Sequence, residues 1–284
     1  MTRTSPRRTP PNGSRARCRL LVKPLEESTM TGFTNLTFTV SDRIATVLLN
    51  RPPVNAVTQQ MYREITEFFS TADEVADAVV LSGAGRHFCG GNDLDEFATL
   101  TPENSDARME VVRTAFFAIQ DCAVPVIGAV NGTAVGTGLA IAASCDFVIA
   151  ADDARLGTPE IGVGVMGGAR HLARLVPEPW VRCMYLTGDP LPASALRALG
   201  GIVDVCSSED LIATAQDWAR RIVRHSGAAI RMAKRSLKEI ETMDIKAGYT
   251  FEQGLTREFS GHPDSREAVR ALLERRSPEF GRAT

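Results

Sequence analysis

The sequence predicts an α/β core followed by a helical C-terminal region. From Met30 onward, short apolar runs bounded by glycine, proline or turn residues alternate with longer amphipathic segments. Such runs are typical of buried strands, and the amphipathic segments are typical of the helices that cover them. After residue 168 the pattern becomes almost wholly helical. We place the core at 30–205 and the helical region at 206–284.

The individual elements follow from these local signals. Ser41-Asp42 joins two of the expected strands as a hairpin, and Thr58 is expected to cap the first helix, whose apolar positions recur at helical spacing. The expected strands are 38–40, 44–49, 78–81, 125–130 and 147–150. The further expected helices are 106–122, 139–145, 169–176, 178–187, 192–199, 209–225, 227–241, 244–259 and 263–275.

Composition limits the class of protein. A chain of 284 residues with 44% hydrophobic residues can bury a large core. No stretch of 18 apolar residues occurs, so we expect no membrane span. Six cysteines without a C-x-x-C pair indicate free thiols in a reducing compartment, which favours a cytoplasmic protein.

The N-terminal segment 1–29 differs from the rest of the chain. It is rich in Arg, Pro, Ser and Thr, and it holds seven Lys/Arg against two Glu. No apolar segment follows the arginines, so we expect a disordered, dispensable extension rather than a targeting peptide. Residues 30–284 then carry 25 Lys/Arg and 32 Asp/Glu, a net charge of −7, which argues against nucleic-acid binding.

The segment 125–168 carries the strongest chemical signal. A buried strand ends at Asn131-Gly132, and Gly136-Thr137-Gly138 then opens an alanine-rich helix. A glycine-rich helix entry presents free backbone N–H groups and the positive end of a helix dipole, which together stabilise an oxygen that becomes anionic during a reaction. Glu160 is the nearby carboxylate that can exchange a proton. Donors for an oxyanion and one base suggest enolate chemistry.

Three blocks of the sequence resemble the motif blocks of the crotonase (enoyl-CoA hydratase/isomerase) superfamily. They are Leu49-Asn50-Arg51-Pro52 with Asn55-Ala56, the segment 82–97, and the segment 125–164. The resemblance implies a crotonase-like spiral of repeated ββα units with a C-terminal helical trimerisation region. It also implies trimers or dimers of trimers and a coenzyme A thioester as substrate, with no separate cofactor and no metal.

By position in these blocks, the backbone N–H groups of Asn92 and Thr137 are expected to form the oxyanion hole. Thr137 departs from the family, which usually has glycine there, and a β-branched residue does not readily take a positive φ. Its hydroxyl can also narrow the pocket. The residues expected at the CoA ester are Arg51, Arg86, Gly90, Gly91, Leu94, Gly136, Gly138 and Arg275. Arg275, in the last helix, corresponds to a segment that reaches a nucleotide phosphate in relatives.

The acids show a second departure. Hydratases that resemble this chain have two glutamates, and the corresponding positions here are Ala140 and Glu160. Hydration is easiest with two carboxylates, whereas moving a double bond needs one base that takes a proton and returns it elsewhere. We therefore expect an isomerase with Glu160 as catalytic residue. Apolar Ile161, Val163 and Met166 are expected to bury Glu160 and raise its pKa.

Other interpretations remain open. The chain could be a hydratase that recruits another acid, a thioester hydrolase, or a non-catalytic or RNA-binding family member. RNA-binding relatives have a lysine-rich first helix, whereas Arg63 is the single basic residue of the segment 58–70. The segment 162–167 matches a dinucleotide fingerprint but lacks the uninterrupted strand before it. His87 and His171 have no second ligand at metal spacing, and Asp93 is expected to cap the turn 94–97.

Overall fold

The fold of this protein, seen in a computed structural model that describes residues 32–281, is built on a six-stranded sheet. The expected extension at 1–29 lies outside the described residues. The strand order is β1-β2-β3-β4-β6-β9; β1 and β2 are antiparallel and the other neighbours are parallel. The strands are β1 Leu36–Ser41, β2 Ile44–Leu49, β3 Ala78–Gly83, β4 Val126–Val130, β6 Phe147–Ala151 and β9 Asp204–Cys206.

A smaller sheet of three short strands is formed by the segments that connect β4, β6 and β9 of the larger sheet. Its order is β5-β7-β8, with β5 parallel and β8 antiparallel to β7. The strands are β5 Thr133–Val135, β7 Arg155–Gly157 and β8 Leu191–Pro192. An isolated bridge between Cys89 and Ala134 extends this pairing to the glycine-rich turn after β3. The smaller sheet therefore ties together the segments that carry the sequence motifs.

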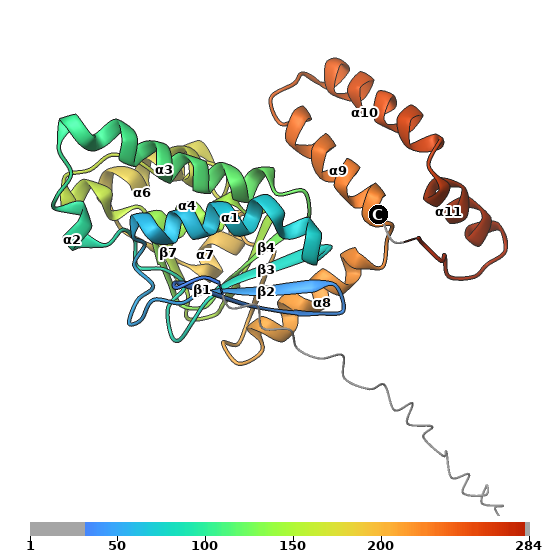
Figure 1. Ribbon diagram of the computed structural model, residues 1–284. Helices are drawn as coiled ribbons and strands as arrows, with labels where there is room; N and C mark the ends of the chain where they lie inside the picture. The colour runs from blue at the N-terminus through green and yellow to red at the C-terminus, as the bar shows by residue number, and fades with distance from the viewer. Residues whose placement is uncertain (1–31, 282–284) are drawn as a thin grey trace, which may run out of the picture.

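Helices cover both faces of the larger sheet. Helix α1 packs on α3, and Figure 1 shows this pair above the sheet and α8, which contacts β2, β3, β4 and β6, below it. Thr58 caps α1 as expected, because its Oγ1 accepts a hydrogen bond from the Met61 N–H. The helices of this part are α1 Gln59–Val75, α2 Leu94–Phe97, α3 Pro102–Asp121, α4 Thr137–Ser144, the 3₁₀ helix η1 Pro159–Val163, α5 Ala169–Leu172, α6 Glu178–Thr187, α7 Ala193–Ala198 and α8 Leu211–Val223.

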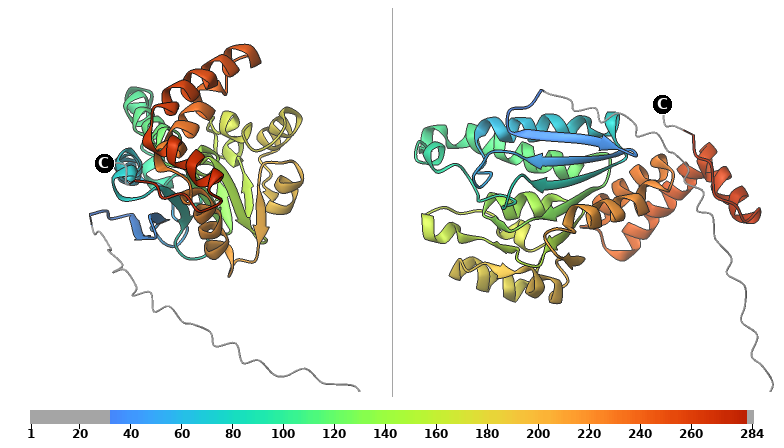
Figure 2. Two further views of the ribbon diagram at one scale, coloured as in Figure 1. Left: turned by 90° about the vertical axis from the view of Figure 1, so that its right-hand side faces the viewer. Right: turned by 90° about the horizontal axis from the view of Figure 1, so that it is seen from below.

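The last three helices extend away from the sheet. They are α9 Gly227–Ile240, α10 Ile245–Ser260 and α11 Pro263–Leu273, and Figures 1 and 2 show them beyond the end of the sheet. Several of their large apolar side chains are exposed in the single chain, among them Leu237, Ile245, Tyr249, Leu272 and Leu273. An exposed apolar surface of this kind is typical of a subunit interface. Self-association through this region stays a prediction.

Local signals missed the short elements. The prediction that the chain is almost wholly helical after residue 168 is wrong at β8 and β9, because strands of two or three residues are too short to show a periodicity. The helix expected over 169–176 ends at Leu172, and a turn over 173–175 follows it. Helix α3 begins earlier than expected, with Pro102 in its first turn.

Asn55 fixes the turns that lead to the site. Its side chain is fully buried, and its Nδ2 donates to the carbonyl oxygens of Ala84, His87 and Phe88 at 2.9, 2.8 and 3.2 Å. Its Oδ1 accepts from the Arg51 N–H at 3.0 Å. The residue has a φ of 54°, a left-handed conformation that asparagine tolerates better than most residues. One side chain thus holds the turn after β2 against the turn after β3.

We expect Asn55→Ala to destabilise the protein by about 2–4 kcal/mol, because it leaves buried carbonyl groups without donors and places alanine in a left-handed conformation. Urea unfolding followed by circular dichroism measures this change. Asn104→Ala, in the exposed first turn of α3, serves as the control and should cost about 1 kcal/mol or less. A loss for Asn55→Ala no larger than that of the control would show that Asn55 is not the organising residue of these turns.

Candidate active site

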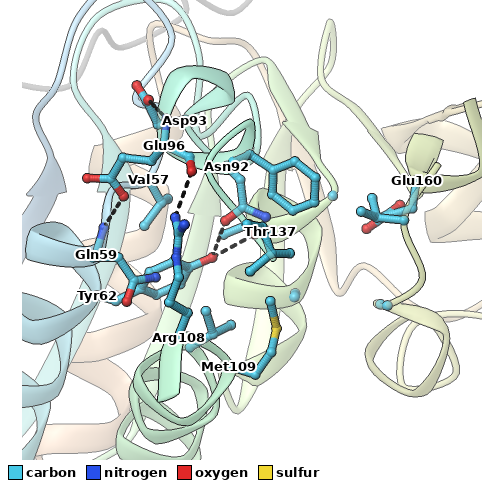
Figure 3. Close-up of a pocket in the computed structure, with 18 of the residues that line it drawn as sticks. Val57, Gln59, Tyr62, Asn92, Asp93, Glu96, Arg108, Met109, Thr137 and Glu160 are labelled. Carbon is cyan, nitrogen blue, oxygen red and sulfur yellow. Dashed lines mark hydrogen bonds between the residues drawn. The ribbon is translucent and has the colours of Figure 1, made fainter. Parts of the chain in front are cut away.

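A cavity of about 390 Å³ lies where α1, α3, the start of α4 and the segment after η1 meet. Apolar side chains from α2, α3 and the segment after η1 form much of its wall: Phe97, Leu100, Met109, Val112, Phe116, Val165 and Met166. Its polar lining includes Tyr62, Asn92, Thr137 and Glu160, which Figure 3 shows around the pocket. A mostly apolar hollow with a few convergent polar groups is the usual form of a small-molecule site.

The N–H of Asn92 is available to a ligand. Its neighbours pair with Val57, since the Val57 N–H donates to the Gly91 carbonyl at 2.8 Å and the Asp93 N–H donates to the Val57 carbonyl at 3.0 Å. In a trans peptide the C=O and N–H groups point in opposite directions, so the Asn92 N–H points away from Val57. No acceptor for it is found among residues 32–281.

The N–H of Thr137 is similarly unpaired within the described chain. Thr137 is the first residue of α4, and the Gly136 carbonyl accepts from the Ala140 N–H at 3.1 Å. The Thr137 N–H therefore points out of the helix N-terminus. The sequence suggested that a positive φ at Thr137 would be unfavourable. The structure has the positive φ at Gly136, at 57°, and Thr137 takes ordinary helical backbone.

Three separate segments meet at Gly136. A Cβ atom placed on Gly136 would lie 3.5 Å from Glu160 Oε1 and 3.9 Å from the Cα of Gly91. The turn with Asn92, the start of α4 and the η1 carboxylate are therefore within reach of a single small group. This is the arrangement expected of a site that holds one oxygen between two donors and presents a base to a neighbouring atom.

Glu160 is half-buried in the wall of the cavity. Its Oε2 atom is buried without a hydrogen-bond partner among the described residues. Desolvation raises the pKa of Glu160, opposed by a hydrogen bond from its own backbone N–H. The predicted rise in pKa by desolvation is thus supported, although Ile161, Val163 and Met166 are themselves largely exposed. The Oε1 atom lies instead against Gly136 and Gly168, whose added Cβ atoms would stand 3.5 and 3.1 Å away.

Ala140 stands one turn into α4 and lines the same cavity as Glu160. Its methyl group cannot exchange a proton, so this wall of the cavity offers no acid at the position where hydratases resembling the chain carry one. Within the described residues, the other carboxylates of the lining, Asp93 and Glu96, already accept hydrogen bonds from backbone N–H groups. Glu160 is the lining carboxylate with an unpartnered buried oxygen.

The residues expected at the CoA ester divide into those near the cavity and those away from it. Arg51 bonds to Asp93 at 2.7 Å, which places its guanidinium beside the Asn92 turn. Asp93 caps α2 as expected, since it accepts from the Glu96 N–H. Leu94 is 70% exposed at the start of α2, and Arg86 is exposed after β3.

The glycines have distinct places. Gly136 lines the cavity, Gly91 has a φ of 109°, and the Gly90 N–H donates to the Val54 carbonyl at 2.8 Å. Gly138 packs on the Cys89 carbonyl so closely that an added Cβ would stand 2.2 Å from it. Arg275 lies after the end of α11 rather than inside the last helix, and α11 lies far from α2 in Figure 1. Its place at a nucleotide phosphate stays a prediction.

The sequence analysis did not single out Tyr62. Its hydroxyl donates to Asn92 Oδ1 at 2.7 Å and shares a 2.8 Å hydrogen bond with Thr137 Oγ1. Tyr62 lies in the apolar stripe of α1, where residues usually belong to the core, and only the polar end of its ring distinguishes it.

No group of three or more side chains suited to a metal occurs in the part of the chain that the structure describes. No helix of that part is long and apolar enough for a bilayer.

Comparison with known proteins gives a consistent picture. The model of the enoyl-CoA hydratase/isomerase family matches residues 39–283. A (7aS)-7a-methyl-1,5-dioxo-2,3,5,6,7,7a-hexahydro-1H-indene-carboxyl-CoA hydrolase from Rhodococcus jostii is 37% identical, over 78% of this chain and 87% of the relative. The 2,3-dehydroadipyl-CoA hydratase of Escherichia coli is 32% identical, over 84% of this chain and 95% of the relative. The crystal structure of enoyl-CoA hydratase from Bacillus anthracis superimposes with a TM-score of 0.83 at 27% identity and covers 87% of this chain and 99% of its own.

The burial of Glu160 predicts a pH-dependent stability. A carboxyl whose pKa is raised in the folded state stabilises the fold at low pH, and this contribution is lost as pH rises through the folded pKa. Glutamine does not ionise, so Glu160→Gln does not undergo this loss of stability. The free energy of unfolding of the variant, relative to that of the parent protein, should therefore rise between pH 5 and pH 8. Urea unfolding at both pH values measures the gain, with Glu239→Gln on the exposed face of α9 as control. A gain that stays constant with pH, or that Glu239→Gln reproduces, would contradict the burial of this charge.

Proposed function

Because the chain belongs to the enoyl-CoA hydratase/isomerase family, whose members act on CoA thioesters, we propose that it moves the double bond of an enoyl-CoA through an enolate. The observation that carries this proposal is the pairing of two free N–H groups with one unpartnered carboxylate in a cavity whose α4 wall carries Ala140. No redox or group-transfer step is involved, so the reaction requires no separate cofactor.

The thioester carbonyl oxygen is placed between the N–H groups of Asn92 and Thr137. Removal of a proton from the neighbouring carbon sends negative charge to that oxygen, and one preorganised donor is typically worth about 3 kcal/mol of barrier. The helix dipole of α4 points its positive end at the same oxygen. Both donors are backbone groups and are in place before the reaction, so they need no reorganisation when the charge develops.

Glu160 carries the proton. Its carboxylate takes a proton from Cα of a 3-enoyl-CoA, which gives a dienolate, and its carboxyl then returns the proton to Cγ, which gives the 2-enoyl-CoA. The carboxylate is regenerated and no atom is gained or lost. The raised pKa of Glu160 supports this role, because a group that must both accept and donate works best when its pKa approaches the working pH.

Hydration is the weaker alternative, because it requires a water to be activated on one side and Cα to be protonated, and Ala140 occupies the place of the second acid.

Hydrolysis is a second candidate, favoured by a specific observation. Two relatives with 37% and 35% identity are named as hydrolases of an indene-carboxyl-CoA. Glu160 would take a proton from a water that attacks the thioester carbon, which gives a tetrahedral oxyanion between the same two N–H groups. Its collapse would break the C–S bond, and the proton on Glu160 would pass to the departing CoA thiolate.

Glu160→Gln tests the proposal directly. The substitution keeps the shape of the side chain and removes the base, so turnover should fall by about 100-fold or more while acyl-CoA binding survives. A panel of 2-enoyl- and 3-enoyl-CoA esters, scored separately for isomerisation, hydration and CoA release, provides the activities. Glu96→Gln alters a second cavity carboxylate that already accepts a hydrogen bond from a backbone N–H, and its turnover should fall far less. Unchanged turnover in Glu160→Gln would overturn the proposed mechanism.

Ala140→Glu should raise hydratase activity relative to isomerase activity, because it restores an acid at the start of α4 beside the cavity. The ratio of 3-hydroxyacyl-CoA to isomerised product, measured by liquid chromatography from one substrate, reports the change. Ala140→Gln has the same length without the acid and serves as the control. If both variants give the parent ratio, the missing acid does not decide between the two reactions.

A further inference from the structure

Tyr62 connects the two segments that carry the proposed donors. It is 1% exposed, and its ring packs edge-on against Phe116 with the centroids 6.0 Å apart. Its hydroxyl reaches the cavity wall between Asn92 and Thr137, as Figure 3 shows. The turn before α2 and the first turn of α4 are therefore linked to one rigid side chain on α1.

The hydrogen bonds of this cluster run in one direction. A tyrosine hydroxyl has one proton, and that of Tyr62 is donated to Asn92 Oδ1 at 2.7 Å. The 2.8 Å bond to Thr137 is then donated by the threonine hydroxyl to Tyr62. Burial raises the pKa of Tyr62 well above its usual range, so the phenol keeps its proton. The order is Thr137 to Tyr62 to Asn92.

This direction has two consequences at the cavity. The Thr137 hydroxyl uses its proton on Tyr62 and has none to give to a ligand. The Asn92 oxygen is occupied by Tyr62, so the amide nitrogen of the same side chain is turned away from it. Thr137 thus contributes its backbone N–H to the site, and its hydroxyl serves to hold that N–H in place.

We propose that Tyr62 is a positioning residue that fixes the distance and direction of the Asn92 and Thr137 N–H groups through the Thr137–Tyr62–Asn92 hydrogen bonds. The inference rests on the proposed function of these N–H groups. Donors in an oxyanion hole act only when they are held within about 0.5 Å of the productive geometry. Asn92 is exposed, and its bridge to Val57 holds its backbone from one side. The hydrogen bond from Tyr62 links the same residue to Thr137 from the other side.

A structural role for the ring alone makes a different prediction. Tyr62→Phe keeps the ring and its packing on Phe116, and it removes only the hydroxyl that links the two segments. Thr137→Val keeps the β-branch and the backbone N–H and removes only the hydroxyl at the other end. Because the three groups act as one unit, either change should lower kcat by about 5- to 10-fold with little change in KM. The double variant should be no worse than either single variant.

Thr71→Val, on the exposed side of α1, removes a hydroxyl in the same way as Thr137→Val and should keep the parent kcat and KM. Equal unfolding midpoints in urea establish that Tyr62→Phe is folded, and Thr137→Val provides an independent route if it is not. A purely structural tyrosine would lower stability and leave kcat unchanged. Additive losses in the double variant, or a loss confined to KM, would overturn the positioning role.

A spectroscopic measurement separates this proposal from the proposed function. The carbonyl stretch of [1-¹³C]butanoyl-CoA, a saturated ester that cannot isomerise, should move to lower frequency when the ester binds the parent protein, because two donors polarise the carbonyl. The shift should be smaller in Tyr62→Phe and Thr137→Val, and unchanged in Thr71→Val. No shift in the parent protein would overturn the oxyanion hole itself. A full shift in both variants would overturn the role of Tyr62 and leave the hole intact.

Discussion

The close packing of the first turn of α4 on the backbone of Cys89 is the contact on which the site depends. Gly138 lies so near the Cys89 carbonyl that any Cβ would overlap it, and the Cys89–Ala134 bridge holds the same two segments in register. This contact brings the start of α4 next to the segment of Gly91 and Asn92, although Asn92 and Thr137 are 45 positions apart in the chain. Asn55 holds the turn after β3, which leads into Cys89, against the turn after β2. Tyr62 links Asn92 to Thr137 from α1. The glycines of the motif blocks are thus needed because the backbones must approach closely.

The chemistry follows from what this packing leaves unpaired. Two N–H groups lack acceptors among the described residues, and one half-buried carboxylate keeps a buried oxygen without a donor. Unsatisfied buried polar groups lower stability, and they are retained where a ligand completes them. The proposed thioester enolate would meet both needs, because its oxygen would accept hydrogen bonds from the two N–H groups and its carbon would exchange a proton with Glu160. In the proposed mechanism, with Ala140 in the α4 wall, Glu160 both takes and returns the proton, which is the basis for proposing isomerisation rather than hydration.

Local signals in the sequence predicted much of the fold and the main chemical groups. The β1–β2 hairpin, the Thr58 cap and the Asp93 cap depend on neighbouring residues, and the structure confirms all three. The three-residue strands β5 and β7 could not be predicted, because their pairing exists only once the motif blocks meet. Tyr62 has the spacing of a core residue, and nothing in its surroundings along the chain indicates where its hydroxyl points. The surroundings of Glu160 were inferred from its sequence neighbours, whereas its carboxylate lies against Gly136 and Gly168, which only the tertiary fold brings near.

The central claim is that Glu160 exchanges a proton with the carbon next to a thioester held by two backbone donors. Solvent exchange into a saturated ester tests this step without requiring the natural substrate. The protein is incubated with butanoyl-CoA in D₂O, and deuterium at Cα is measured by mass spectrometry. The account predicts enzyme-dependent exchange of a Cα hydrogen that Glu160→Gln slows by about 100-fold or more. Absence of exchange in the parent protein saturated with the ester, or equal exchange in the glutamine variant, would contradict it.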